Sequence, residues 1–185
     1  MSTANANSGA NAPVLKLADL VGGRKPVEPP FVFSDEERHE IEHELGHYDD
    51  NRAATIEALK IVQKHRGWVP DNAIAPLGEI IGIPASDVEG VATFYNMIFR
   101  RPVGRNVIKL CDSISCFLTG YDEVREAIIK HIGVGLGQTT ADNRFTLLPI
   151  CCLGACDKGP VAMINDDTIG NLDPTQIPKL LEQYP

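Results

Sequence analysis

The sequence predicts an α+β protein in which a helical bundle precedes a unit of mixed strands and helices. Residues 34–100 show helical periodicity and helix-capping signals, whereas short apolar runs alternate with helical stretches from residue 101 onward. All five cysteines lie in this second unit, in two groups that each follow a predicted strand. We therefore divide the chain into an N-terminal extension (1–33), a helical bundle (34–100) and a site-bearing domain (101–185).

The composition limits the size of the core and the classes of partner that we expect. The 185 residues are 43% hydrophobic, enough for one moderate core or two small ones, and the formal net charge of −8 disfavours nucleic acid or anionic lipid as a partner. The amino terminus lacks a secretory pattern, and no run approaches the roughly 20 apolar residues of a membrane helix, so we expect no direct membrane insertion. Residues 1–33 are rich in Asn, Ala, Ser, Gly and Pro, which predicts a flexible extension.

The bundle is expected to contain four helices. The first begins with a capping box, because the Ser34 hydroxyl can accept the Glu37 amide while the Glu37 carboxylate reaches back to the Ser34 amide. A similar pattern at Ser86 predicts a second capping box. We expect Trp68, Phe94 and Tyr95 to pack within this unit. The expected helices span about 34–48, 51–65, 71–82 and 86–95, with Gly67 and Gly82 as stops.

The second unit is expected to follow the order β-α-β-β-β-α. Strands are predicted at 107–110 and 145–150, and a hairpin of strands 161–164 and 168–172 turns at 165–167. Pro149 places its strand at a sheet edge or ends its ladder there. Helices are predicted at 121–132 and 173–183, and the glycines of 133–137 indicate a helix-ending loop rather than a nucleotide-binding loop. This order places both cysteine groups at strand ends, where α/β sheets present their sites.

The cysteine groups are typical of a metal centre. Cys111 and Cys116 have four residues between them, and Cys151 and Cys152 precede Cys156. Thiolates select zinc, copper(I) or iron-sulfur clusters, and spacing alone does not distinguish zinc from iron. The odd cysteine count argues against a disulfide framework.

The surroundings of the cysteines favour iron-sulfur over zinc. Small residues line both groups and allow backbone amides to approach cluster sulfurs. Cys151 and Cys152 are adjacent, so their side chains diverge and only one is expected to share a metal with Cys156, a choice that chemistry leaves open. Phe117 and Leu118 either exclude water from the site or contact a partner.

A second motif points to different chemistry. His39, Glu40 and His43 fit the H-E-x-x-H pattern of zinc proteases, in which two histidines bind zinc and the glutamate acts as general base. Five glutamates indicate that this helix is exposed to solvent. A protease helix should lie in a cleft, and few residues precede this helix to form one. We therefore expect a charged surface helix and retain a metalloprotease as a remote alternative.

The cysteine motifs resemble those of a known family. The chain closely resembles the 2Fe-2S subunit family of bacterial NADH:quinone oxidoreductase, respiratory complex I, from about residue 34 to the end. The matching stretches are Arg144–Pro160, which contains the Cys-Leu-Gly-Ala-Cys run, Cys111–Cys116, and Val88–Tyr95. The resemblance implies a thioredoxin-like ferredoxin domain behind a helical bundle.

The resemblance also implies a ligand set. Carried over residue by residue, the cluster ligands are Cys111, Cys116, Cys152 and Cys156. Cys151 then becomes a buried free thiol. No catalytic residue is expected, because one-electron transfer needs no acid, base or nucleophile on this chain.

By the same resemblance, the chain is an electron-transfer subunit that carries one 2Fe-2S cluster and performs no hydride chemistry. Its cluster exchanges electrons with the FMN of a partner subunit that oxidises NADH, and a further iron-sulfur subunit of the peripheral arm is a second partner. The expected location is the bacterial cytoplasm, on the cytoplasmic side of the inner membrane. Alternatives are the equivalent subunit of an NAD-linked hydrogenase or formate dehydrogenase and, remotely, a structural zinc adaptor.

Overall fold

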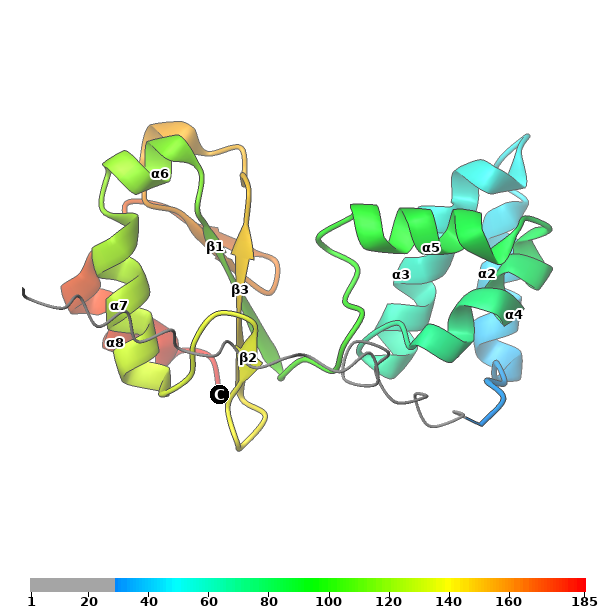
Figure 1. The fold of residues 1–185 in the computed structure, drawn as a ribbon, viewed down its shortest axis with the longest axis horizontal. Coiled ribbons are helices and arrows are strands. Elements are labelled where there is room, and N and C mark those ends of the chain that lie inside the picture. Colours follow the sequence, from blue (N-terminus) through cyan, green and yellow to red (C-terminus); the bar gives the residue numbers. More distant parts are fainter. Residues whose placement is uncertain (1–28) are drawn as a thin grey trace, which may run out of the picture. The chain divides into compact units, whose positions relative to one another are not determined.

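Four α-helices form the first half of the part that the computed structural model describes, residues 29–185 (Figure 1). The flexible extension expected over 1–33 therefore lies almost wholly outside the described residues. One 3-10 turn leads into the second helix, and another leads into the third. The elements are α2 (Asp35–Leu45), η1 (Asn51–Ala54), α3 (Thr55–Arg66), η2 (Asp71–Ala73), α4 (Ile74–Ile81) and α5 (Ala85–Phe94).

The start of α2 confirms the first capping box. The Glu37 amide donates to Ser34 Oγ at 3.2 Å, and the Ser34 amide donates to Glu37 Oε2 at 2.7 Å. The predicted box at Ser86 is wrong, because α5 begins one residue earlier at Ala85 and has no side-chain cap. Pro84 occupies the N-cap position and has no side-chain oxygen to accept the first amides, and Ser86 lies inside the first turn.

A single apolar core holds the four helices together. Both helix stops predicted at glycine are confirmed, since Gly67 and Gly82 take φ values of 80° and 83°. The prediction that Phe94 and Tyr95 pack inside is wrong, because α5 buries Val88 and Ala92 and leaves Phe94 77% exposed, and Tyr95 after it is 41% exposed. The fully buried side chains of this core include Ile41, Leu59, Val62, Leu77, Ile81 and Val88.

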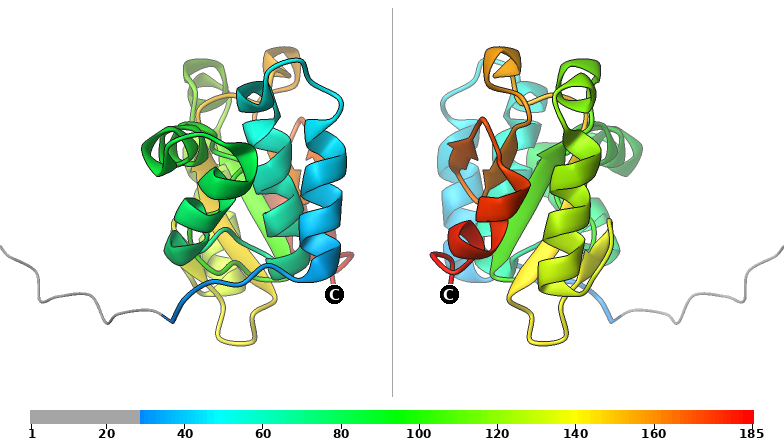
Figure 2. Two further views of the ribbon diagram at one scale, coloured as in Figure 1. Left: turned by 90° about the vertical axis from the view of Figure 1, so that its right-hand side faces the viewer. Right: turned by 90° about the vertical axis from the view of Figure 1, so that its left-hand side faces the viewer.

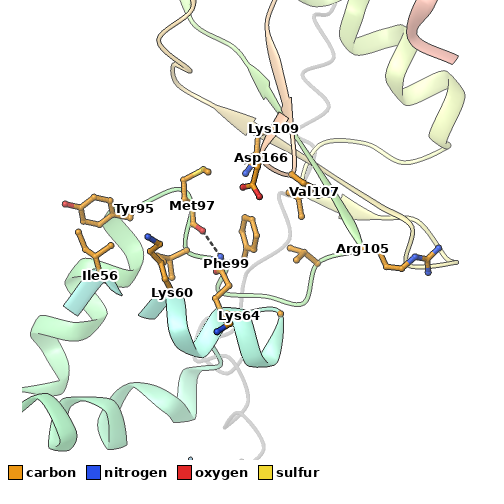
Figure 3. Close-up of a pocket in the computed structure, with 16 residues that line it drawn as sticks. Ile56, Lys60, Lys64, Tyr95, Met97, Phe99, Arg105, Val107, Lys109 and Asp166 are labelled. Carbon is orange, nitrogen blue, oxygen red and sulfur yellow. Dashed lines mark hydrogen bonds between the residues drawn. The ribbon is translucent and has the colours of Figure 1, made fainter. Parts of the chain in front are cut away.

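The segment after α5 is tied back to α3 by one side chain. Gln63 donates to the Met97 carbonyl at 2.9 Å, a bond drawn in Figure 3, and accepts the Phe99 amide at 2.6 Å. A pocket of about 760 Å³ lies beside this segment and is lined by Met97, Phe99 and buried Lys109 among others (Figure 3). Burial lowers the pKa of Lys109, and the charge of Asp166 partly opposes that effect.

A five-stranded sheet forms the second half, in the order β2-β3-β1-β4-β5. The pair β1–β3 is parallel, and the three other pairs are antiparallel. The strand β2 is too short to carry an alternating pattern, and the sequence does not predict it. The strands are β1 (Asn106–Cys111), β2 (Gln138–Thr139), β3 (Phe145–Ile150), β4 (Ala162–Ile164) and β5 (Asp167–Ile169).

Two local predictions for the sheet are refined by the structure. The strand with Pro149 lies between two others, but β2 pairs only with Thr146 and Leu147, so the ladder on that side ends before the proline. The hairpin turn contains two residues, Asn165 and Asp166, and β5 begins at Asp167 and ends at Ile169. Asn165 has a φ of 53°, which asparagine tolerates in tight hairpin turns.

Helices α7 (Tyr121–Ile132) and α8 (Ile177–Leu181) lie side by side against the sheet (Figures 1 and 2). Val124 and Ile128 of α7 join Ile177 of α8 and the sheet residue Ile108 in one buried cluster. Helix α7 matches its predicted range and ends at Gly133, which confirms the glycine-rich segment as a helix-ending loop. The end of the sheet where β1 and β3 finish carries the cysteines.

Candidate metal centre

The first predicted ligand is fixed by the end of β1. Cys111 pairs in register with Ile150 of β3, and its amide donates to the Val161 carbonyl at 3.0 Å. Its side chain is 2% exposed, in a small apolar cluster with Ile150 and Val161. The parallel pairing therefore brings the end of β1 beside the start of the second cysteine loop, 40 residues later.

A short helix that the sequence does not reveal carries the second cysteine. Helix α6 (Ile114–Leu118) places Cys116 in the apolar cluster with 1% exposure. The Thr119 hydroxyl ends this helix by donating to the Ser115 carbonyl at 2.9 Å and the Cys116 carbonyl at 3.2 Å. Its single turn is too short to show apolar periodicity, but the Ser113 that precedes it is a residue typical of helix starts.

The second cysteine loop turns back on itself at Gly154. This glycine has a φ of 74°, a left-handed conformation that strains any residue with a Cβ, and its amide donates to Cys152 Sγ at 3.3 Å. The sulfurs of Cys152 and Cys156 lie 3.9 Å apart. The loop (in orange) and α6 lie at the same end of the sheet in all views (Figures 1 and 2).

Cys151 contacts the thiol of Cys111 through its backbone carbonyl. This carbonyl accepts the Cys111 thiol at 3.8 Å, so the main chain of Cys151 lies beside this thiol. The expectation that Cys151 is buried is wrong, because the side chain is exposed. The strand β3 ends at Ile150, and the chain leaves the sheet toward solvent at this residue. All five cysteines are free in the structure.

The four remaining thiols form two pairs that interact electrostatically. Burial, followed by a hydrogen bond with Cys111, raises the pKa of Cys116, and a backbone hydrogen bond from Val161 partly opposes this rise. The pKa of Cys156 is raised mainly by a hydrogen bond with Cys152, and a hydrogen bond with the Ser115 side chain partly opposes this rise. Neighbouring thiolates repel each other, so a bound cation favours the thiolate form of the group. A set of four such sulfurs suits a soft, positively charged centre.

Apolar side chains surround the exposed side of this group. Ile114, Phe117 and Leu118 of α6 are 68%, 54% and 76% exposed. They form a patch directly beside Cys116 on the same helix turn. Exposed apolar side chains that cluster beside a functional group are typical of contact surfaces, so of the two interpretations for Phe117 and Leu118 the exposure favours a partner contact.

The glutamate of the H-E-x-x-H motif, Glu40, forms contacts with α3. The Glu40 carboxylate accepts Lys64 Nζ at 3.1 Å and lies 3.2 Å from His65 Nε2. The hydrogen bond from Lys64 is the main cause that lowers the pKa of Glu40. A general base in this motif must face a metal-bound water, whereas Glu40 joins α2 to α3. This arrangement supports the charged surface helix.

The family model described as Thioredoxin-like [2Fe-2S] ferredoxin matches residues 41–185. The chain belongs to this family. The thioredoxin-like fold and the 2Fe-2S cofactor follow from this membership, and the four-thiol donor set at the sheet end fits that cofactor. A zinc adaptor and a metalloprotease are thereby set aside.

Relatives of this ferredoxin align over most of its length. The E subunit of NADH-quinone oxidoreductase from Pseudomonas aeruginosa is 64% identical over 154 residues, which cover 83% of this chain and 93% of the relative. The E subunit from Escherichia coli (strain K12) is 59% identical over 161 residues, with 87% and 97% covered. An NAD+-reducing [NiFe]-hydrogenase structure in the air-oxidized state superposes with a TM-score of 0.59 at 26% identity. It covers 71% of this chain but only 22% of the hydrogenase chain.

Proposed function

We propose that Cys111, Cys116, Cys152 and Cys156 bind the 2Fe-2S cluster and that Cys151 remains a free thiol. A 2Fe-2S cluster takes two thiolates on each iron, and the thiols of this chain are grouped in two pairs. The 3.9 Å between the Cys152 and Cys156 sulfurs matches the roughly 3.8 Å expected for two thiolates that share a tetrahedral metal with bonds near 2.3 Å.

The residues around the proposed ligands exclude water from one side of the centre and stabilise the charge of a ligand sulfur. Ile150 and Val161 enclose Cys111 and Cys116 and exclude water from that side. The Gly154 amide stabilises negative charge on the Cys152 sulfur. Cys152 and Cys156 are exposed, which leaves this side of the site open to a protein partner.

The chain serves as an electron-transfer subunit of an NADH:quinone oxidoreductase. The observation that carries this function is an alignment at about 60% identity over nearly the whole length of the quinone-linked relatives. When bound, the cluster supplies one-electron redox chemistry. The chain contributes to an oxidoreductase without hydride chemistry of its own, and its cluster exchanges electrons with FMN on a partner that oxidises NADH.

Further parts of the proposal concern partners and location. A second iron-sulfur subunit of the peripheral arm is the other expected neighbour, and the complex places the chain on the cytoplasmic side of the inner membrane. Among the described residues, no helix has the length and apolar character to span a membrane.

A role in an NAD-linked hydrogenase is the second candidate function, and the superposition with the hydrogenase supports it. The lower identity and coverage of that match favour the quinone-linked complex.

We also infer that residues 34–100 and 101–185 are separate domains. Two different apolar cores support this division, one made by side chains between Phe33 and Ile98 and the other by side chains between Ile108 and Leu181. Inter-domain boundaries fall where few buried side chains cross, and the segment 101–105 is such a region.

Five single substitutions test the ligand set. Changing Cys111, Cys116, Cys152 or Cys156 to Ala should abolish stable retention of iron and of the visible absorption, because each removes one of four thiolates. Cys151→Ala is the matched control and should retain about two irons per chain, the content of a 2Fe-2S centre. Loss of iron in Cys151→Ala with retention in Cys152→Ala would show that the register of the second loop is shifted by one residue.

Reconstitution tests the role of the chain. NADH should leave the visible spectrum of the isolated protein unchanged and should bleach it once the FMN-bearing subunit of an NADH:quinone oxidoreductase is added. Bleaching by NADH without a partner would contradict the absence of hydride chemistry on this chain. Bleaching only with the corresponding hydrogenase subunit would instead support the second candidate.

A further inference from the structure

Three side chains of types that commonly bind metal ions converge at the carboxyl end of α2, apart from the cysteines. His43, Glu44 and His47 each offer one donor atom, and these atoms all lie within 4.8 Å of one another. The two imidazole rings lie edge to face with centroids 4.8 Å apart. His47 Nδ1 is 3.3 Å from Glu44 Oε2.

The backbone explains why His47 stays near the other two. Helix α2 ends at Leu45, but the chain continues in tight turns in which the Gly46 amide donates to the His43 carbonyl at 3.2 Å. The His47 amide donates to the Glu44 carbonyl at 3.1 Å in the same way. These i to i−3 bonds keep His47 above Glu44 and His43, because residues three and four apart share one face of such a turn.

The chemistry of this group suits a divalent ion of the zinc class. Imidazole and carboxylate are common zinc ligands, with bonds of about 2.0–2.2 Å, so two ligands on a tetrahedral ion lie roughly 3.4 Å apart. The contact between His47 and Glu44 already has this length, and small side-chain rotations bring the third donor into range. The end of a helix also carries partial negative charge that favours a cation.

The three side chains are accessible to such an ion. The side chains of His47 and Glu44 are 56% and 29% exposed, so an ion can enter and retain water as a fourth ligand. The Glu44 carboxylate contacts His47 itself, so zinc would replace a contact within the group. Glu40 of the overlapping H-E-x-x-H motif is committed to Lys64 and His65 instead.

We propose that His43, Glu44 and His47 form a surface binding site for Zn²⁺ or a similar divalent transition-metal ion. The site uses His43 of the H-E-x-x-H motif but neither His39 nor Glu40, so it is not a protease centre. A bound ion links the last turn of α2 to the residues that follow it and thereby stabilises the bundle by mass action.

Calorimetric titration of the cluster-loaded full chain with zinc sulfate tests the proposal. We expect one saturable site in the unaltered protein and in the control His39→Ala, which removes a histidine of the same helix outside the group. Replacing a residue that only hydrogen-bonds to a metal ligand typically weakens metal binding by about 10- to 100-fold. Replacing a ligand itself, as in His43→Ala or His47→Ala, should therefore weaken zinc binding by at least about 100-fold. The visible spectrum is recorded during each titration so that attack on the cysteine centre is detected.

A second measurement separates the site from general binding to exposed carboxylates. Zinc should raise the urea midpoint of the bundle, followed by the fluorescence of the single tryptophan Trp68, in the unaltered protein and in His39→Ala but not in His47→Ala. Equal zinc binding by the unaltered protein and His47→Ala would overturn the proposal, as would the absence of a saturable site. Loss of binding in His39→Ala would assign the metal to the H-E-x-x-H pair instead.

Discussion

Replacing Glu37 by glutamine tests how the first helix of the bundle is anchored. The Glu37 carboxylate is 1% exposed and accepts two bonds from Arg66, each 2.6 Å long, in addition to the amide of Ser34. The hydrogen bond from Arg66 is the main cause that lowers the pKa of Glu37 from 4.5 to about 2. Glutamine keeps the size of the side chain and removes its charge.

The magnitude follows from the pKa. A fall from 4.5 to about 2 corresponds to about 3.4 kcal/mol of stability when the carboxylate is ionised, at about 1.36 kcal/mol per pKa unit. Arg66 is 40% exposed, so solvent screens the pair, and we expect Glu37→Gln to lower the free energy of unfolding by about 2 kcal/mol at pH 7.

The pH dependence has a defined sign. Because the folded pKa is depressed, the contribution of Glu37 is fully present above the unfolded value of 4.5 and is lost as the pH falls toward 2. At pH 3 less than about half of it remains. The difference in stability between the unaltered protein and Glu37→Gln should therefore shrink from pH 7 to pH 3.

Urea denaturation followed by Trp68 fluorescence provides the assay, since Trp68 lies just after α3 and is the single tryptophan of the chain. Glu36→Gln is the matched control, because it makes the same change at an exposed position in the same helix turn. Equal losses in the two variants at pH 7, or a difference that is the same at both pH values, would refute the argument.

Three further predictions concern the second half of the chain. Gly159→Ala should lower iron retention, because its Cβ would lie 2.6 Å from Thr119 Oγ1 and displace the end of α6, whereas Gly90→Ala, where a Cβ meets open space, should leave iron content unchanged. Lys109→Met should match or exceed the unaltered protein in urea stability at pH 7, because burial lowers the pKa of Lys109 and penalises its charged form. That penalty fades as the pH rises through the folded pKa toward 10.5, so an advantage that grows above pH 10 would contradict this interpretation. Leu118→Glu should slow NADH-dependent bleaching with the FMN-bearing partner by about 10-fold or more at unchanged iron content. Leu136→Glu, at an exposed apolar residue distant in sequence from the site, is its control, and equal effects of the two would argue against a contact at α6.

The sequence predicts those features whose signals are local and strong. The capping box at Ser34 and the glycine stops at Gly67 and Gly82 are each set by a few neighbouring residues, and the structure confirms them. The range of α7 follows from a long apolar stripe. The placement of both cysteine groups at strand ends follows from apolar runs that end at Cys111 and Cys151.

Other features depend on tertiary context, and sequence patterns miss or misjudge them. Helix α6 and strand β2 are too short for periodicity, and pairing with β3 alone defines β2. The exposure of Phe94 depends on which face of α5 meets the bundle, and the exposure of Cys151 depends on where β3 leaves the sheet. The choice between Cys151 and Cys152 rests on family resemblance, and the structure adds that Cys151 offers its carbonyl to Cys111.

The register of β1 with β3 has a consequence for how the protein matures. Cys111 and Ile150 stand opposite each other only after two segments separated by α7 have formed a parallel pair. Such non-local pairing is a slow step, since the entropy of closing the intervening chain is lost before any contact is gained. The two halves of the proposed ligand set are thus far apart in a nascent chain, and a complete thiol site signals that the central strands have paired. A cellular system that delivers iron and sulfide to this site would thereby distinguish folded chains from unfolded ones without recognising any other part of the protein.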